Sequence, residues 1–215
     1  MSTPDVRELN ASAVPAQIDS AQVQVPQRAV VVVDDIDAQL MVLMRDGDRD
    51  AGNQLVRRNA ERVSRFVARV VRNPRVIEDL TQDVFKNMVR YAARYEPACK
   101  FSTWIYRIAT NIALDYLDRA AVRKRETAAV SDGETLPDRR SERPDRRMSL
   151  DELRAAVAAA LESLPPNQRI AITLHQYETM SYEQIAAIME CSVESVRSLL
   201  ARARVALRER LGGMD

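Results

Sequence analysis

One stretch of the sequence interleaves aromatic, cationic and amide side chains, all of which can contact nucleotides. Trp104, Arg107 and Asn111 are spaced so that they share one stripe of a helix. An indole stacks on a base, a guanidinium pairs with a phosphate and an amide hydrogen-bonds a base edge. Tyr95 and Lys100 lie in the loop just before them. These five residues predict a surface for unpaired nucleotides, the single-strand platform. The alternative is that the aromatic rings belong to the core.

A second candidate surface lies on the last segment with helical spacing, from about Val193 to Arg210. The apolar residues of this segment fall on one side of a helical wheel. Four residues on the other side form the duplex-reading face: Arg197, Ser198, Ala201 and Arg202. The stretch 197–208 contains four arginines and no acid, so it can neutralise phosphates and enter a major groove. The alternative is a solvated helix of a bundle.

The residues before this helix fit a helix-turn-helix. Ser181 and Gln184 form a capping box that opens a short helix ending near Met189. Ser192 is placed to cap the last helix, so only about three residues, 190–192, join the two helices. Two helices joined in this way are the arrangement with which many proteins read duplex DNA.

Acidic residues gather at the start of another predicted helix, just after Pro74. Asp79, Gln82 and Asp83 form the acidic patch. Acids in a first helical turn interact favourably with the helix dipole, which explains the patch without any partner. A protein-binding surface is the second interpretation.

The sequence lacks the residue clusters of an enzyme or of a metal site. His175 is the single histidine, and Cys99 and Cys191 are isolated, so we expect neither a zinc site nor a disulfide. Five glycines in the whole chain make a Gly-rich phosphate loop improbable. We therefore expect no catalytic residue, no metal and no cofactor.

The spacing of apolar residues predicts an all-α fold, because no segment sustains the period-two alternation of a strand. We expect a flexible N-terminal tail at 1–33, a helical domain at 34–119, a flexible linker at 120–148 and a helix-turn-helix domain at 149–212. The predicted helices span about 36–45, 49–72, 76–94, 102–119, 150–163, 167–177, 182–189 and 193–210.

Charge and hydropathy limit the possible partners. The 32 basic and 31 acidic residues balance, so any DNA contact must come from local patches. The apolar run 29–33 is far shorter than the roughly 20 residues of a membrane span. The N-terminus also lacks the pattern of a secretory signal. We expect a cytoplasmic protein that does not insert into a membrane.

Several of these segments also match a known family in order and spacing. The segments 78–85 (EDLTQDVF) and 101–111 (FSTWIYRIATN) resemble region 2 of extracytoplasmic-function (ECF, group IV) sigma factors of the sigma-70 family. The segments 161–166 (LESLPP), 181–186 (SYEQIA) and 196–204 (VRSLLARAR) resemble region 4 of the same family. The resemblance covers about 35–211.

The resemblance implies a non-enzymatic protein that directs RNA polymerase to promoters. The acidic patch would bind the core polymerase. The single-strand platform would recognise and help to melt the −10 element, and the duplex-reading face would read the −35 element. An anti-sigma factor is a further implied partner.

Two features depart from the family's pattern. Glu190 stands in the turn where helix-turn-helix proteins often have glycine, and Ala201 stands where a larger side chain is common. The sequence also leaves other functions open. One is a helix-turn-helix regulator that binds duplex operators without polymerase, and another is a structural adaptor made of two helical bundles.

Overall fold

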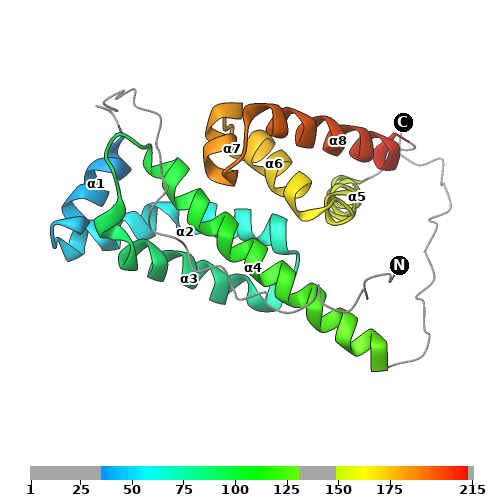
Figure 1. The fold of residues 1–215 in the computed structure, drawn as a ribbon, viewed down its shortest axis with the longest axis horizontal. Coiled ribbons are helices and arrows are strands. Elements are labelled where there is room, and N and C mark those ends of the chain that lie inside the picture. The colour runs from blue at the N-terminus through cyan, green and yellow to red at the C-terminus, as the bar shows by residue number, and fades with distance from the viewer. Residues whose placement is uncertain (1–34, 131–148, 213–215) are drawn as a thin grey trace, which may run out of the picture. The chain divides into compact units, whose positions relative to one another are not determined.

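The computed structural model describes residues 35–130 and 149–212. Within these ranges every regular element is a helix, and no strand is present (Figure 1). This confirms the predicted all-α fold. The predicted tail at 1–33 and most of the predicted linker lie outside the described residues.

The first group of helices surrounds the long helix α2. It comprises α1 (Ile36–Arg45), α2 (Arg49–Val71), α3 (Ile77–Arg90) and α4 (Phe101–Val130), with short 3-10 turns at Pro74–Val76 and Ala92–Arg94. Helix α2 packs against α1, α3 and α4 because its apolar residues recur at helical spacing. Leu55, Phe66, Met88 and Ile105 are buried in this core.

The second group contains the helix-turn-helix. It comprises α5 (Leu150–Glu162), α6 (Pro166–Tyr177), α7 (Tyr182–Met189) and α8 (Val193–Leu211). Ser181 and Gln184 form the predicted capping box, and Ser192 caps α8 by accepting a hydrogen bond from the Ser195 amide. Ile185 and Leu200 are buried between α7, α6 and α8.

Helix α4 differs from its prediction at both ends. It begins at Phe101, so Ser102 lies inside the first turn and is not the predicted cap. The Asp35 carboxylate, which lies just before α1, accepts a hydrogen bond from the Phe101 amide at 3.2 Å. It thus satisfies one of the free amides at the start of α4. The helix also continues past Arg119 to Val130, since residues 120–130 contain neither proline nor glycine and are rich in good helix formers.

Helix α3 is shorter than predicted. It ends at Arg90 rather than Arg94, and a separate 3-10 turn follows at Ala92–Arg94. After this break Tyr95 turns inward and its side chain is buried. The sequence predicted one longer helix here because a 3-10 turn keeps a helix-like backbone, so the helical spacing of side chains continues across the break.

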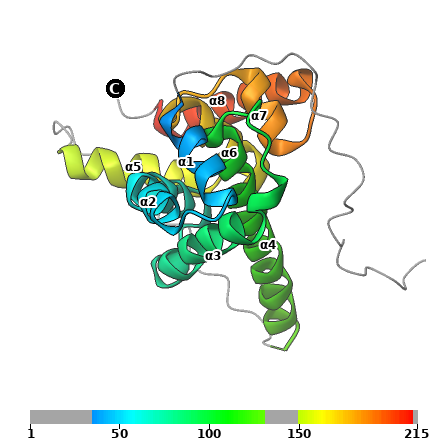
Figure 2. The same ribbon diagram turned by 90° about the vertical axis from the view of Figure 1, so that its left-hand side faces the viewer.

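The two groups belong to one compact unit and pack directly on each other. Helix α4 lies against α7, and α2 lies against α6 (Figures 1 and 2). The spacing of apolar residues predicted two helical domains joined by a linker, but this contact between them was not predicted. The packing brings residues more than 70 positions apart in the chain into hydrogen-bond range.

Arg169 is a buried cation that joins the two groups. Its guanidinium donates to the carbonyl of Val70 in α2 at 2.7 Å. It also donates to the carbonyls of Glu162 and Leu164, at 2.8 and 2.9 Å, near the end of α5. Burial lowers the pKa of Arg169, because its surroundings solvate the charge less well than water does. The three carbonyls offset part of that desolvation.

Replacing Arg169 tests this bridge. Arg169→Met should lower the free energy of unfolding by roughly 2–4 kcal/mol, because it removes charge-assisted hydrogen bonds to three carbonyls. Urea unfolding followed by circular dichroism measures the loss. The matched control is Arg154→Met on α5, an exposed arginine that should cost under about 0.5 kcal/mol. Equal losses in both variants would contradict the bridging role.

Candidate nucleic-acid interface

The single-strand platform is built on the first turns of α4. Trp104 is half-buried, with its ring 5.4 Å from that of Tyr95 and 6.4 Å from that of Phe101. Arg107 and Asn111 follow on the same stripe of the helix, and Asn111 is exposed. Part of the indole is therefore fixed by packing while its remaining surface stays accessible to a base.

Tyr95 supports the single-strand platform from the core and is not part of its surface. Its ring is only 2% exposed, and its hydroxyl donates to the carbonyl of Cys99 at 2.8 Å. Burial raises the pKa of Tyr95, so the hydroxyl stays protonated and remains a donor. In this conformation the ring supports Trp104 in an edge-to-face contact and cannot itself stack on a base. Lys100, by contrast, is exposed at the start of α4.

The Arg107 side chain bonds to the second group of helices. Its Nη2 and Nε atoms donate to the carbonyl of Ala187 in α7, at 2.8 and 3.2 Å. Its Nε atom also lies 3.4 Å from a carboxylate oxygen of Glu190, the residue that ends α7. The predicted phosphate ligand thus already has protein acceptors in this arrangement.

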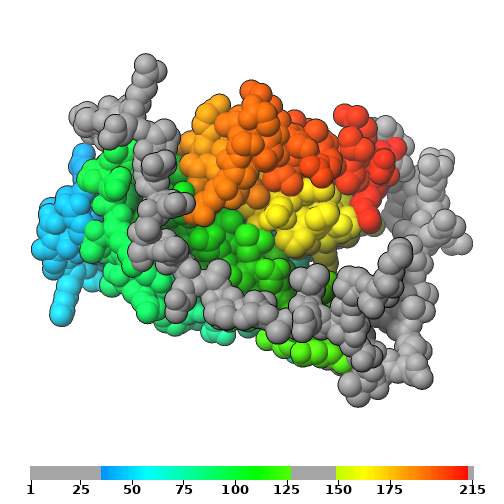
Figure 3. All heavy atoms as spheres, viewed as in Figure 1, coloured from blue at the N-terminus to red at the C-terminus, as the bar shows by residue number. Residues whose placement is uncertain are grey.

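The duplex-reading face lies on α8, at the surface of the molecule (Figure 3). Arg197, Ala201 and Arg202 are exposed, and Ser198 is half-buried. Arg202 donates to the Ser198 hydroxyl at 2.7 Å, and Arg197 pairs with Glu194 at 3.4 Å. The partners of both arginines also lie on α8, so a single rigid helix holds the whole duplex-reading face.

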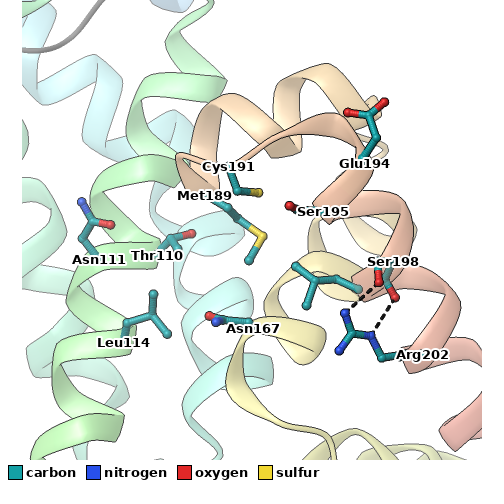
Figure 4. A pocket seen from close by; sticks show the side chains of 11 residues that line it. Thr110, Asn111, Leu114, Asn167, Met189, Cys191, Glu194, Ser195, Ser198 and Arg202 are labelled. Atoms are coloured by element: carbon teal, nitrogen blue, oxygen red, sulfur yellow. Dashed lines mark hydrogen bonds between the residues drawn. The ribbon is translucent and has the colours of Figure 1, made fainter.

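A groove of about 510 Å³ brings the two predicted DNA-contacting sets together. Thr110, Asn111 and Leu114 of α4 form one wall, and Ser198 and Arg202 lie among the residues of the facing wall (Figure 4). Met189 and Cys191 lie between the walls. The groove therefore has an apolar centre and polar margins contributed by both groups.

The turn of the helix-turn-helix adopts a left-handed backbone. Glu190 has φ 52° and ψ 45°, which is the conformation that glycine favours at the end of a helix. The departure noted in the sequence therefore leaves the turn geometry unchanged. Its cost is the strain of a residue with a Cβ atom in the left-handed region.

The acidic patch lies on the first two turns of α3, a helix that carries none of the predicted DNA-contacting residues. Asp79 and Gln82 are exposed, and Gln82 donates to Glu78 at 3.4 Å. Asp83 is half-buried and accepts from Lys86 at 2.9 Å. Of the two carboxylates in the patch, Asp79 is therefore the more accessible.

A cluster that the sequence did not predict surrounds Glu178, in the loop between α6 and α7. The Glu178 side chain is only 5% exposed, accepts from the Tyr106 hydroxyl and lies 3.3 Å from Nη2 of Arg62. Burial and the hydrogen bond to Glu178 raise the pKa of Tyr106, so its hydroxyl stays protonated. No periodicity could have found this cluster, because its members come from three separate elements.

The described residues offer no group of three His, Cys, Asp or Glu side chains able to hold a metal ion. Burial raises the pKa of the Cys99 and Cys191 thiols, which lowers the fraction of reactive thiolate. Among the described helices none is long and apolar enough to cross a membrane.

Comparison with known proteins assigns both groups of helices. Residues 55–123 match the model of sigma-70 region 2, and residues 154–207 match that of sigma-70 region 4. The first match contains most of α2 to α4, and the second contains most of α5 to α8. Region 4 thus includes the duplex-reading face, and region 2 includes the acidic patch and the single-strand platform.

Three characterised relatives extend along most of the chain. The RNA polymerase sigma-H factor of Pseudomonas aeruginosa is 32% identical, over 81% of this chain and 93% of its own. The RNA polymerase sigma factor CarQ of Myxococcus xanthus is 37% identical, over 81% and 97%. The ECF RNA polymerase sigma-E factor of Escherichia coli is 36% identical, over 80% and 92%.

Two solved structures share the fold at 24% sequence identity. One is CnrH in complex with the cytosolic domain of CnrY, with a TM-score of 0.63 over 84% of this chain and 100% of that one. The other is the sigma factor RpoE in complex with the anti-sigma factor NepR from Bartonella quintana, with a TM-score of 0.59 over 76% and 98%. From the two family matches and the near full-length relatives, the chain belongs to the extracytoplasmic-function sigma factors of the sigma-70 family and directs promoter recognition by RNA polymerase.

Proposed function

We propose a division of labour in which three surfaces of the chain contact the polymerase, the −10 element and the −35 element. The observation that carries the proposal is the pairing, on one chain, of an exposed Arg-rich helix after a tight turn with a Trp-Arg-Asn stripe on α4. The first suits duplex DNA and the second suits unpaired nucleotides. A protein that must both find and open a promoter needs both.

Helix α8 is the proposed reader of the −35 element. Arg197 and Arg202 can contact guanine edges or phosphates, and Ser198 can donate to or accept from a base edge. Ala201 has only a methyl group, so its contribution is an apolar contact, such as with a thymine methyl. Because Arg202 is held by Ser198 at 2.7 Å, its guanidinium is partly oriented before DNA arrives.

The single-strand platform is the proposed reader of the −10 element. Unstacking a base costs about a few kcal/mol, which binding of the displaced strand must offset. Trp104 would stack on an extruded base, Asn111 would hydrogen-bond its edge, and Arg107 and Lys100 would pair with phosphates. Tyr95 would act from below, by holding the indole of Trp104 in place.

The acidic patch is the proposed docking site for the core polymerase. By resemblance to the family, Asp79, Gln82 and Asp83 would contact the clamp coiled coil of the largest subunit. Their position supports this, since they lie on α3 and not on α4, the helix that carries Trp104 and Asn111. Polymerase and single-stranded DNA could then bind at the same time.

An anti-sigma protein is the proposed regulator. Both solved structures with this fold contain a second protein, CnrY in one and the anti-sigma factor NepR in the other. We propose that this chain is held inactive by a protein of the same class and that it acts in the cytoplasm with RNA polymerase.

Arg202→Ala tests the −35 assignment. Promoter use in run-off transcription should fall about 5- to 150-fold, because one good base contact is worth roughly 1–3 kcal/mol. Affinity for core polymerase should not change. Arg154→Ala, an exposed arginine on α5, is the matched control and should transcribe normally. Loss of core binding and promoter use together in Arg202→Ala would contradict the assignment.

Asp79→Arg tests the docking assignment. Affinity for core polymerase should fall roughly tenfold, which corresponds to about 1.4 kcal/mol, since a cation would meet the surface that the carboxylate contacts. The matched control is Glu78→Arg, in the same helical turn and equally exposed to the helix dipole. Fluorescence titration of labelled protein with core enzyme gives both affinities. If the two variants lose the same affinity, the contact is not specific to Asp79.

A further inference from the structure

The carboxylate of Asp35 accepts hydrogen bonds from the starts of two different helices. Its Oδ1 atom accepts from the Ala38 amide of α1 at 3.1 Å, and its Oδ2 atom accepts from the Phe101 amide of α4 at 3.2 Å. Amides at a helix start have no partner within the helix, and an acid there also interacts favourably with the helix dipole. One half-buried side chain therefore caps α1 and ties it to the start of α4, 66 positions away in the chain.

Helix α1 is itself anchored to α2, so it can hold the start of α4 in place. Asp37, in the first turn of α1, pairs with Arg58 of α2 and accepts from the side-chain amide of Asn59 at 3.2 Å. Asn59 is buried, as are Ala38 and Met41 of α1. The start of α1 is thus held by α2 and in turn holds the start of α4.

The loop between α3 and α4 meets the helix at the same point. The Tyr95 hydroxyl donates to the Cys99 carbonyl at 2.8 Å, so one hydrogen bond spans this loop. Its last residue, Lys100, is followed directly by Phe101, whose amide donates to Asp35. The bond to Asp35 therefore fixes where the loop joins the helix.

Trp104 lies in the first turn of α4, next to this junction. Its amide donates to the Lys100 carbonyl at 3.2 Å. Its ring lies 5.4 Å from the ring of Tyr95 and 6.4 Å from that of Phe101. A binding site has to hold its groups within about 0.5 Å of the productive geometry. A shift of the backbone at Phe101 would therefore displace the indole from the position in which it can stack on a base.

We propose that Asp35 is a positioning residue for promoter melting. Its carboxylate fixes the start of α4 against α1 and so sets the place of Trp104 and of the preceding loop. It acts through contacts within the protein, and this proposal rests on the proposed role of the single-strand platform at the −10 element. Without the bond to Phe101 the helices stay folded, but the platform captures the displaced strand less well.

Asp35→Asn separates the two hydrogen bonds of the carboxylate. Asparagine keeps one side-chain oxygen, and it caps helices about as well as aspartate does. Its amide nitrogen carries two donors and cannot accept from the Phe101 amide. Asp35→Ser is a second variant with the same logic, because serine also caps helices but has a shorter side chain with a single oxygen.

The matched controls are Asp48→Asn and Asp48→Ser. Asp48 caps α2 by accepting from the Asp50 and Ala51 amides, at 2.8 and 3.1 Å. Both of these bonds stay at the start of its own helix, so the controls change the same kind of cap without touching α4.

The test uses the full chain assembled with core polymerase, on a promoter that the native chain and core enzyme select from a genomic library. Permanganate reactivity of unpaired thymines measures melting. Each Asp35 variant should melt the duplex promoter roughly tenfold less than the native chain, equivalent to about 1.4 kcal/mol. Both Asp48 variants should melt it normally. Helix content by circular dichroism and core affinity by fluorescence titration should stay unchanged in all four variants.

A template whose −10 region is already unpaired gives a readout that a merely structural role would not change. Because its strands are already apart, the platform no longer has to offset the cost of unstacking, and Asp35→Asn should transcribe within about twofold of the native chain. Equal losses on the duplex and the unpaired template would overturn the proposal. So would normal duplex melting by both Asp35 variants, or an equal loss in the Asp48 controls.

Trp104→Ala in the same assay separates this proposal from the proposed function. Loss of duplex melting in Trp104→Ala, with none in either Asp35 variant, would reject the positioning role and leave the platform in place. Normal melting by Trp104→Ala would reject the platform and, with it, the proposed route from Asp35 to the displaced strand.

Discussion

The guanidinium of Arg107 can serve only one set of acceptors at a time, and this limit connects the fold to the function. In the structure the acceptors are the Ala187 carbonyl and the Glu190 carboxylate of the helix-turn-helix group. During promoter recognition the proposed acceptor is a phosphate of the displaced strand. Carbonyl, carboxylate and phosphate oxygens all accept hydrogen bonds from a guanidinium. The same arginine therefore suits both DNA and an acceptor within the protein.

Helix α4 makes this competition possible because two of its faces are in use. One face packs Ile105 and Ala109 into the core of region 2. The other carries Trp104, Arg107 and Asn111, which are therefore fixed relative to the core. Asp35 holds the helix start through the Phe101 amide, and the buried ring of Tyr95 supports Trp104. Small shifts in the core would move the whole stripe together.

The sequence was informative where function follows from local spacing. Helical periodicity predicted the elements, and the capping serines at 181 and 192 predicted the first residues of α7 and α8. The wheel of α8 correctly separated its buried and exposed sides. Tyr95 was predicted at the surface but is buried, because an aromatic ring in a loop carries no periodic signal that tells core from surface. Glu178, Tyr106 and Arg169 were not found, since their partners are set by the packing of separate elements.

We expect this chain to open promoters only together with core polymerase. Permanganate reactivity of unpaired thymines measures this most directly, on DNA fragments that the assembled enzyme selects from a genomic library. Reactive thymines should appear near the −10 position when the chain and core enzyme are both present, and none should appear with either alone. Tight binding of the free chain to duplex DNA, without strand opening in the presence of core enzyme, would contradict this expectation.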